Sequence, residues 1–361
     1  MRLMELTCTG FRCLRHLSWS PLPGLNVIRG LNAQGKTTIL EALLFAATSK
    51  SHRTNTESDL LREGDDRFYI KAAVERLDRS VTLEAMWLGG AKRFRVNGVP
   101  QARISDILGK IHLVFFSPED VALVRGAAAV RRTFMDMELS QLSPAYLRAL
   151  QQYRLVMRHR NQLLRADRWD ENQLDVWDAQ LAEHGERLMR DRSQFVQELS
   201  VFASRSYQLL SGAEDMSMIY KPCVRQPGSL ASVLAGCRAN DIKQKVTTQG
   251  PHRDDIDLFI AGRNARHFAS QGQQRTAALA IKLAEVDLVH QRIGEFPILM
   301  LDDVLGELDV NRSNRLVQAL DRGIQCLLTT TNLTDSARIF GSRCGEFEVS
   351  AGEFVRHGGE K

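Results

Sequence analysis

The chain lacks the features that would place it outside the reducing interior of a cell. Six cysteines occur among its 361 residues and none of them forms a CxxC pair, which argues against both a zinc site and a disulfide framework. No apolar run is long enough to cross a bilayer, and the opening residues MRLME do not begin a signal peptide. We therefore expect a cytoplasmic protein with no membrane partner.

Extremes of composition and charge are also missing. Hydrophobic residues make up 43% of the chain and charged residues 25%, as in an ordinary soluble protein of one large domain or two packed lobes. The formal net charge of +5 is too small to identify a polyanionic partner by itself. Most of the basic residues are arginines, which suit bidentate phosphate contacts better than lysines do.

A glycine-rich segment near the N-terminus carries the most specific signal. Residues 30–37, GLNAQGKT, fit the pattern GxxxxGK[ST], and they lie between a predicted strand and a predicted helix. Gly30 and Gly35 would let backbone N–H groups surround phosphate oxygens. Lys36 would neutralise the β- and γ-phosphates, and Thr37 would offer its hydroxyl to Mg²⁺. The segment predicts binding of a nucleoside triphosphate, with ATP and Mg²⁺ as the expected cofactors.

A carboxylate pair far along the chain would complete such a site. The buried strand predicted at Ile298 to Leu301 ends in Asp302 and Asp303. Asp302 would hold the metal in part through water, and Asp303 would orient or polarise the attacking water. Positions 36 and 302 are 266 residues apart, whereas small P-loop kinases and GTPases place the two motifs much closer. The spacing predicts an ATPase core that is split by a large insertion.

The stretch ASQGQ, residues 269–273, opens a long apolar-periodic helix just before the second carboxylate strand. It resembles the LSGGQ signature of ABC-type ATPases and keeps Ser270, Gly272 and Gln273 of that pattern. In ABC-type dimers the signature caps the γ-phosphate bound to the partner subunit, and a D-loop, matched here by Asp309, crosses the interface. The resemblance implies an ATP-dependent homodimer. Ser270 has an alternative role as an ordinary helix N-cap.

Further segments extend the resemblance over the whole chain. LTCTGFRCL, FSPEDVALVRGAAAVRRTFMDMEL and TTQGPHRDDIDLFIAGR occur in the order found in the RecF family of bacterial DNA-repair ATPases, which are related to SMC-type heads. The resemblance implies an α/β fold: an ABC-type P-loop ATPase head, lobe I, with an inserted mainly helical lobe II and no long coiled-coil arms. We expect lobe I at residues 1–118 and 290–361, and lobe II at residues 119–289.

The same resemblance implies a function in recombinational repair and replication restart. It implies a slow, DNA-stimulated ATPase that binds double-stranded DNA and its junctions with single-stranded DNA, and that helps RecO and RecR load recombinase at gaps. The expected catalytic residues are Lys36, Asp302 and Asp303, the expected Mg²⁺ ligands are Thr37 and Asp302, and the expected nucleotide-binding residues are Arg12, Gly30, Asn32, Gly35, Lys36, Thr37, Thr38, Ser270, Gly272, Gln273 and Asp309.

Departures from the ABC pattern concern the hydrolytic switch. Asp303 stands where transporter-type members carry glutamate, and its side chain is shorter by one methylene, so water activation should be weaker or differently arranged. Thr330 or Thr331 occupies the place of the switch histidine. Ser117 or Glu119 occupies the Q-loop position, where no glutamine is present. These departures do not affect the prediction of nucleotide binding.

The insertion carries helical periodicity at residues 131–165 and 169–210, joined by a polar turn at residues 167–170. Three arginines share one face of the first helix, with Arg160 at its edge. That face could contact a DNA backbone, or it could form ion pairs with acidic residues of the second helix. The three arginines are Arg154, Arg158 and Arg165, and the acidic residues are Glu183, Glu186 and Asp191.

Other interpretations stay open at this point. A transporter ATPase subunit is disfavoured by the missing switch histidine, and a small-molecule kinase by the motif spacing. A DNA-binding scaffold with a vestigial ATP site would differ by showing no nucleotide-dependent change of oligomeric state. The turn GPHRDD is also unresolved, because the sequence does not say whether His252 and Arg253 meet ATP, DNA or Asp254.

Overall fold

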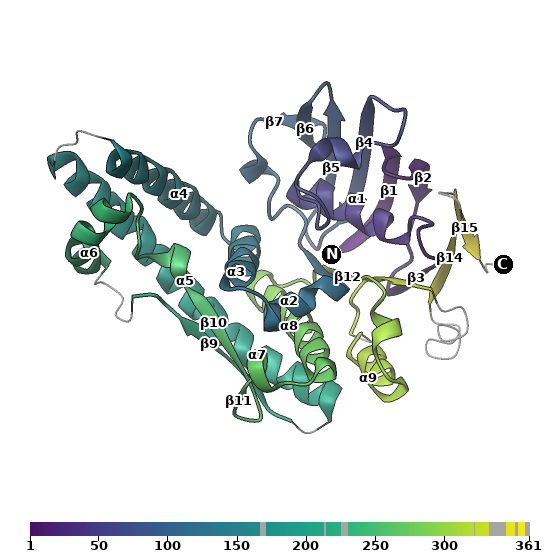
Figure 1. Ribbon diagram of the computed structural model, residues 1–361. Coiled ribbons are helices and arrows are strands. Elements are labelled where there is room, and N and C mark those ends of the chain that lie inside the picture. Colours follow the sequence, from purple (N-terminus) through teal and green to yellow (C-terminus); the bar gives the residue numbers. More distant parts are fainter. Residues whose placement is uncertain are drawn as a thin grey trace. The chain divides into compact units, whose positions relative to one another are not determined.

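The computed structural model describes residues 1–166, 171–212, 214–224, 230–320, 322–331, 344–350 and 353–357. The chain divides into two compact units (Figure 1). Unit 1 comprises Met1–Asp120, Leu209–Gly212 and Lys282–Lys361, and unit 2 comprises Val121–Gln208 and Ala213–Ile281. The sequence led us to expect boundaries at 118/119 and 289/290. The division places them at 120/121 and 281/282 and assigns residues 209–212 to unit 1; both the expected and the observed second boundary fall inside one continuous helix, α8, Gln271–Ile293.

An antiparallel sheet forms the first layer of unit 1. Its strand order is β2-β1-β4-β5-β6-β7. Buried and partly exposed residues alternate along β4, as expected for a strand with one face on the core and the other toward solvent. The strands are β1 Arg2–Phe11, β2 Leu14–Trp19, β4 Arg67–Glu75, β5 Ser80–Leu88, β6 Ala91–Val96 and β7 Val99–Gln101.

A second sheet of unit 1 has the order β15-β14-β3-β13-β12-β8 and is parallel except for β15. All four residues of β12 are buried, as in parallel sheets that are covered on both faces. Since β3, β13 and β12 are parallel neighbours, the residues that follow them meet at one edge. The strands are β3 Leu25–Arg29, β8 Leu113–Phe116, β12 Ile298–Leu301, β13 Cys326–Thr330, β14 Gly345–Ser350 and β15 Glu353–His357.

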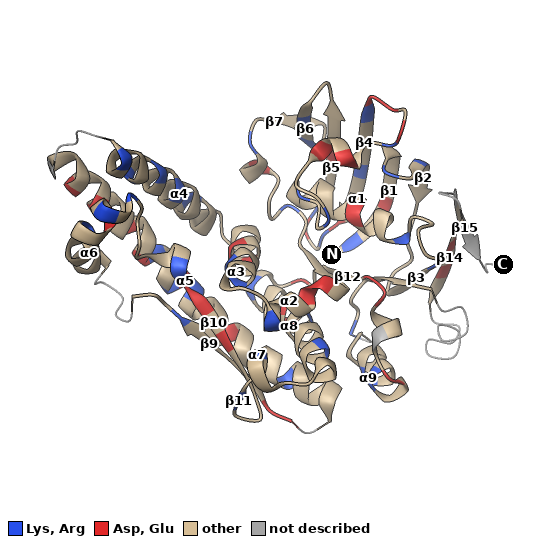
Figure 2. Ribbon diagram, viewed as in Figure 1, with Lys and Arg blue, Asp and Glu red and all other residues tan. Residues whose placement is uncertain are grey.

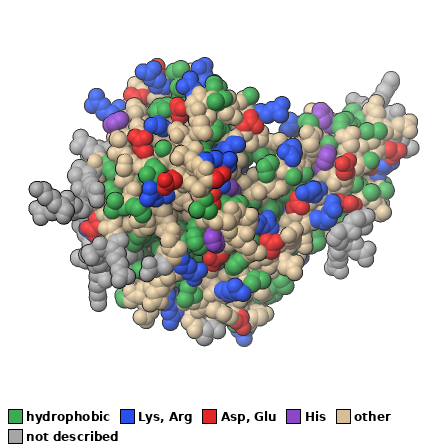
Figure 3. All heavy atoms as spheres, turned by 180° about the vertical axis from the view of Figure 1, so that it is seen from behind, with side chains coloured by type: hydrophobic (Ala, Val, Ile, Leu, Met, Phe, Trp, Pro, Cys, Tyr) green, Lys and Arg blue, Asp and Glu red, His purple; other side chains and the backbone are tan. Residues whose placement is uncertain are grey.

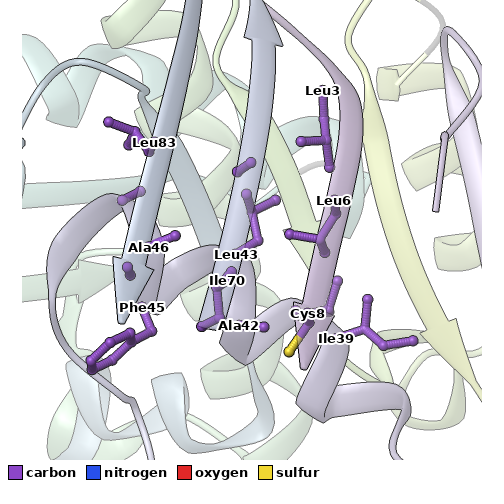
Figure 4. Packing of buried hydrophobic residues seen from close by; sticks show 14 of the residues in the cluster. Leu3, Leu6, Cys8, Ile39, Ala42, Leu43, Phe45, Ala46, Ile70 and Leu83 are labelled. Atoms are coloured by element: carbon purple, nitrogen blue, oxygen red, sulfur yellow. The ribbon is translucent and has the colours of Figure 1, made fainter. Parts of the chain in front are cut away.

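Helix α1, Lys36–Thr48, fills the space against the antiparallel sheet. Its apolar side chains Ile39, Ala42, Leu43, Phe45 and Ala46 lie with those of β1, β4 and β5 in Figure 4. Burial of this apolar surface holds the start of the helix, and therefore the glycine-rich loop before it, in a fixed place. The remaining helices of unit 1 are α9 Val310–Leu320 and the 3₁₀ turns η1 Glu57–Leu60, η2 Ile104–Asp106, η3 Pro118–Val121 and η5 Val304–Glu307.

Unit 2 is mainly helical and contains a small sheet of order β11-β10-β9. Its longest element, α5, spans 41 residues and ends in unit 1. The elements are α2 Ala122–Arg125, α3 Ala128–Leu142, α4 Pro144–Arg165, α5 Glu171–Ser211, β9 Met216–Lys221, α6 Leu230–Gln244, η4 Pro251–Arg253, β10 Asp255–Ile260, β11 Arg263–Asn264, α7 Ala265–Phe268 and the first part of α8.

One expectation about local structure was wrong. The segment 131–165 is not one helix but two, because Ser143 has an extended backbone and caps α4, accepting a hydrogen bond from the Tyr146 amide at 3.2 Å. The predicted polar turn at residues 167–170 lies outside the described residues.

A network of buried charges organises unit 2. The guanidinium of Arg192 lies between two carboxylates, 2.8 Å from Asp136 Oδ1 and 2.9 Å from Asp254 Oδ2. Tyr146 donates to Asp136, and Tyr220 donates to Asp254. Asp254 belongs to the GPHRDD turn, so at least this residue of the turn holds the unit together.

Arg160 belongs to a second buried network and not to the edge of the exposed face. Its side chain is fully buried, 2.5 Å from Asp178 Oδ1 and 2.8 Å from Asp241 Oδ2. Helical periodicity could not reveal this burial, because the two carboxylates come from α5 and α6, distant in sequence.

Candidate nucleotide-binding site

The glycine-rich loop has a backbone that only glycine fits at its two ends. Gly30 has φ 152°, and a Cβ atom there would lie 2.4 Å from the Val349 carbonyl oxygen. Gly35 has φ 110°, and a Cβ atom there would lie 2.9 Å from the Cys13 sulfur. Both positions therefore combine a left-handed or otherwise restricted backbone with a close approach that excludes any side chain.

Lys36 begins helix α1 and lies inside the loop. Its Nζ donates hydrogen bonds to the carbonyl oxygens of Gly30 and Leu31, both at 2.8 Å. Burial lowers the pKa of Lys36, while the charges of Asp303 and Asp302 oppose that shift. The lysine thus supplies a positive charge within the loop where a phosphate chain would bind.

Adjacent parallel strands bring the segment with Asp302 and Asp303 next to the glycine-rich loop. Asp302 Oδ1 accepts hydrogen bonds from Thr37 Oγ1 at 2.8 Å and from Thr329 Oγ1 at 2.6 Å. The Thr329 hydroxyl also accepts from the Asp303 amide at 3.0 Å. The pairing of β3 with β13 and of β13 with β12 accounts for the meeting of these three segments. Residues 37 and 302, far apart in sequence, are direct neighbours.

Asp303 has an unusual backbone and an unsatisfied side chain. It lies in the left-handed region at φ 50°, which is uncommon for a non-glycine residue and is often associated with functional sites. Its Oδ1 atom is buried without a hydrogen-bond partner. Burial raises the pKa of Asp303, and the charge of Lys36 opposes the rise.

These groups surround a pocket of about 430 Å³ in unit 1, within the range of small-ligand sites. Its oxygen donors fit Mg²⁺, which prefers carboxylates, hydroxyls and water. The unpartnered Asp303 Oδ1 is consistent with a further group in the pocket. The lining residues are Arg12, Cys13, Asn32, Ala33, Gly35, Lys36, Thr37, Thr38, Arg53, Asp302, Asp303 and Thr329.

Among the lining and supporting residues not anticipated from the sequence, three are charged or carry a hydroxyl group. Thr329, rather than Thr330 or Thr331, places its hydroxyl on Asp302. Arg53 lines the pocket, and the fully buried Glu41 pairs with Arg12 at 2.7 Å. The sequence offered one signal for the role of Glu41. A charged residue among the apolar positions of α1, where the helix packs on the core, indicates a buried partner.

The chain is similar over most of its length to proteins of a known family. The family model described as the RecF/RecN/SMC N terminal domain matches residues 2–337. The DNA replication and repair protein RecF of Symbiobacterium thermophilum is 41% identical over 98% of this chain and 98% of that protein. The corresponding protein of Geobacillus kaustophilus is 39% identical, covering 92% of this chain and 93% of the relative.

The chain belongs to the RecF family.

Solved structures support the same assignment. A structure of the recombination mediator protein RecF with ATP matches with a TM-score of 0.91 at 31% identity, over 99% of this chain and 98% of that one. An SMC head structure matches with a TM-score of 0.60 at 16% identity, which shows a shared fold alone. The expected fold class, an ABC-type ATPase head, is confirmed, as is a function in DNA replication and repair.

The signature-like residues of this RecF-family chain lie in unit 2 at the start of α8. Ser270 and Gln273 cap the helix reciprocally: the Gln273 amide donates to Ser270 Oγ at 3.2 Å, and the Ser270 amide donates to Gln273 Oε1 at 2.9 Å. Gln273 also donates to Glu214 at 3.0 Å. Ser270 is therefore an N-cap, as the alternative interpretation held, and Gly272 is the second residue of the helix.

Other expected site residues lie outside the pocket. Asp309 is exposed and accepts a hydrogen bond from the Arg312 amide at 2.9 Å, at the start of α9. Ser117 follows β8, and its amide donates to Asp120 Oδ2 at 2.8 Å. Glu119 lies in the turn after it.

The ring of His252 forms hydrogen bonds within unit 2. Its ring nitrogens lie 2.7 Å from the Tyr153 hydroxyl and 3.0 Å from the Thr247 carbonyl oxygen. Burial lowers the pKa of His252 to about 4, so it is neutral at physiological pH. Arg253 is exposed, whereas the carbonyl oxygen of Asp254 accepts a hydrogen bond from Arg132 at 2.8 Å.

Basic residues recur along the ribbon of α4 (Figure 2). Arg154 forms an ion pair with Asp136 of α3 at 2.8 Å, so the expected partners on the second helix were wrong. Arg158 and Arg165 are exposed and form no ion pair with a described residue. Basic and acidic side chains are interspersed on the face drawn in Figure 3.

Among described residues, no helix is long and apolar enough to cross a membrane.

Proposed function

We propose that this RecF-family protein binds ATP in the pocket of unit 1 and uses it to control a homodimer on DNA. The convergence of Lys36, Thr37, Asp302 and Asp303 on one 430 Å³ pocket carries this proposal. These residues come from opposite ends of the chain, and a site that needs both ends in register is difficult to explain as a vestige.

Each residue has a role that follows from its position. Lys36 neutralises the β- and γ-phosphates, while backbone N–H groups of the loop surround the phosphate oxygens. Thr37 and Asp302 would hold Mg²⁺, in part through water, and the ion would supply charge neutralisation for the triphosphate. Asp303, with its unpartnered Oδ1, orients or polarises the attacking water. Arg12, Asn32 and Thr38 line the same wall.

Dimerisation would add contacts that one subunit lacks. In this proposal the N-terminus of α8, with Ser270, Gly272 and Gln273, docks on the γ-phosphate bound to the partner subunit, because helix N-termini favour anions. Asp309 lies at the interface. ATP closes the dimer, since two shared nucleotides stabilise only the associated state, and slow, DNA-stimulated hydrolysis reopens it.

The DNA partner is proposed from the family and from the free arginines of α4. The RecF relative of known structure is described as a recombination mediator in the RecFOR pathway. By analogy we propose that this protein binds double-stranded DNA and its junctions with single-stranded DNA, and acts with RecO-type and RecR-type partners at gaps. Arg158 and Arg165 are exposed and are our candidates on α4 for phosphate contact, whereas Arg154 is held by Asp136.

Sedimentation of the pure protein without nucleotide, with ATP and with ADP tests the proposal. We expect dimers with ATP only, and none for Lys36→Met, which lacks the charge that offsets the triphosphate. Lys110→Met, at an exposed lysine away from the pocket, is the control and should dimerise normally. Dimers of Lys36→Met with ATP would contradict the mechanism. A wild-type protein that keeps one oligomeric state in all three conditions would favour a DNA-binding scaffold.

A further inference from the structure

Glu41 is a buried carboxylate beside the pocket that the proposed chemistry does not use. It lies in α1, four residues after Thr37, and its side chain is fully buried. A buried charge is unfavourable unless it is paired and hydrogen-bonded. The partners of Glu41 therefore indicate what it does.

Glu41 contacts two segments that reach the pocket separately. Its Oε1 accepts from Arg12 Nη2 at 2.7 Å and from Ser51 Oγ at 2.5 Å. Ser51 Oγ in turn accepts from the Arg53 amide at 2.9 Å and from the Thr54 amide at 3.2 Å. The guanidinium of Arg53 lies 3.9 Å from Glu41 Oε2. One carboxylate thus holds both the β1–β2 turn and the loop after α1.

The contact fixes the orientation of Arg12. The residue has a left-handed backbone at φ 51°, and its two terminal nitrogens donate to Glu41 and to the Asp59 carbonyl oxygen. Its Nε is buried without a hydrogen-bond partner. Arg12 and Arg53 both line the pocket. A guanidinium held in this way loses little conformational freedom when it meets a phosphate, which strengthens binding.

We propose that Glu41 is a positioning residue for nucleotide binding, which holds the guanidinium of Arg12 and, through Ser51, the turn that carries Arg53 against the triphosphate. The inference rests on the proposed ATP site. It differs from a purely structural role in one respect: the effect of Glu41 on ATP affinity must pass through the two arginines.

A double-mutant cycle separates these roles. The dissociation constant for ATP is measured by calorimetry for wild type, Glu41→Gln, Arg12→Ala/Arg53→Ala, and the triple variant. We expect Glu41→Gln to weaken ATP binding roughly tenfold in the wild-type background, because an uncharged amide holds a guanidinium less firmly. In the background without the two arginines, Glu41→Gln should change the dissociation constant for ATP by less than twofold.

Two further variants control for folding. Glu295 is buried to a similar degree and pairs with Arg76 away from the pocket, so Glu295→Gln should lower the melting temperature without changing ATP affinity. Ser51→Ala removes a neutral link and should weaken ATP binding roughly two- to threefold, only when Arg53 is present. It remains informative if Glu41→Gln does not fold.

The outcomes separate this inference from the ATP site itself. Failure of the wild-type protein to bind ATP would overturn both. Normal wild-type binding with an equal loss from Glu41→Gln in both backgrounds would overturn the inference alone, since Glu41 would then act on the fold. Unchanged ATP affinity in folded Glu41→Gln would overturn it as well.

Discussion

Buried carboxylates occur in both units, but their environments differ. In unit 2, both oxygens of Asp254 accept hydrogen bonds, from Cys223, Tyr220 and Arg192, and both oxygens of Asp241 do so as well. In unit 1, Asp303 and Glu41 each keep one buried oxygen without a hydrogen-bond partner, although Arg53 lies 3.9 Å from that oxygen of Glu41. These two carboxylates of unit 2 are fully hydrogen-bonded and these two of unit 1 are not, whereas Glu295 of unit 1, which does not line the pocket, accepts at both oxygens.

That difference separates a structural charge from a functional one. A satisfied carboxylate stabilises the fold, because removal of one member leaves the others buried and uncompensated. An unsatisfied carboxylate costs free energy that the folded state recovers only when another group binds there. The comparison predicts opposite consequences for the same substitution in the two units.

The largest effect is expected from Asp254→Asn. This change leaves Arg192 buried with one carboxylate, and we expect it to lower the free energy of unfolding by about 3 kcal/mol, measured by urea denaturation. ATP affinity should stay unchanged in the folded protein. Asp257→Asn, on β10 and in a more exposed ion pair with Lys221, is the matched control, with an expected cost below about 1 kcal/mol. If the two variants lower the free energy of unfolding equally, the buried network of Asp254 is no more important for stability than an exposed ion pair.

Asp303→Asn should show the reverse pattern. The change preserves the shape of the side chain but removes the charge that orients water, so ATP turnover should fall by about 100-fold while ATP affinity persists. The free energy of unfolding should be lowered by no more than about 0.5 kcal/mol, because Asp302 lies beside it and adds unfavourable like charge. A dimer on DNA should live longer in excess ATP. Dissociation as fast as wild type would show that Asp303 does not control release.

The sequence indicated most of the residues that line the pocket of unit 1, because the constraints on them are local. The glycines of the loop, Lys36 and Thr37 lie within eight positions, and the carboxylate pair directly follows a recognisable buried strand. Strand, loop and helix have to follow one another in that order for the loop to bind phosphate. The meeting of Thr37 with Asp302 then follows from parallel strand pairing.

The buried networks of unit 2 could not be predicted in the same way. Arg160 and Arg154 both lie on α4 and have similar sequence surroundings, yet one is buried and the other is 57% exposed. Their partners come from α3, α5 and α6, and no periodicity encodes which helices meet. Ser143 similarly separates α3 from α4, because its side chain caps the start of α4. The apolar pattern continues on both sides of Ser143 and concealed this signal.

The smallest effect concerns the arginines of α4, where one face again contains paired and free charges. Arg154 is held by Asp136, which also accepts from Arg192 and Tyr146. Arg158 is exposed and has no ion pair with a described residue. A side chain that already neutralises a carboxylate releases no counterion when DNA binds, whereas a free one does.

We therefore expect Arg158→Ala to reduce the slope of log affinity against log salt by about 1, measured on double-stranded DNA with saturating ATP. Arg154→Ala should leave the slope unchanged and lower the free energy of unfolding by up to about 1 kcal/mol, because its pair is half exposed. Arg205→Ala, at an exposed arginine beside the Phe202 ring on α5, controls for charge alone. If Arg154→Ala flattens the slope and Arg158→Ala does not, the pair with Asp136 opens on DNA, and the paired charge is the functional one.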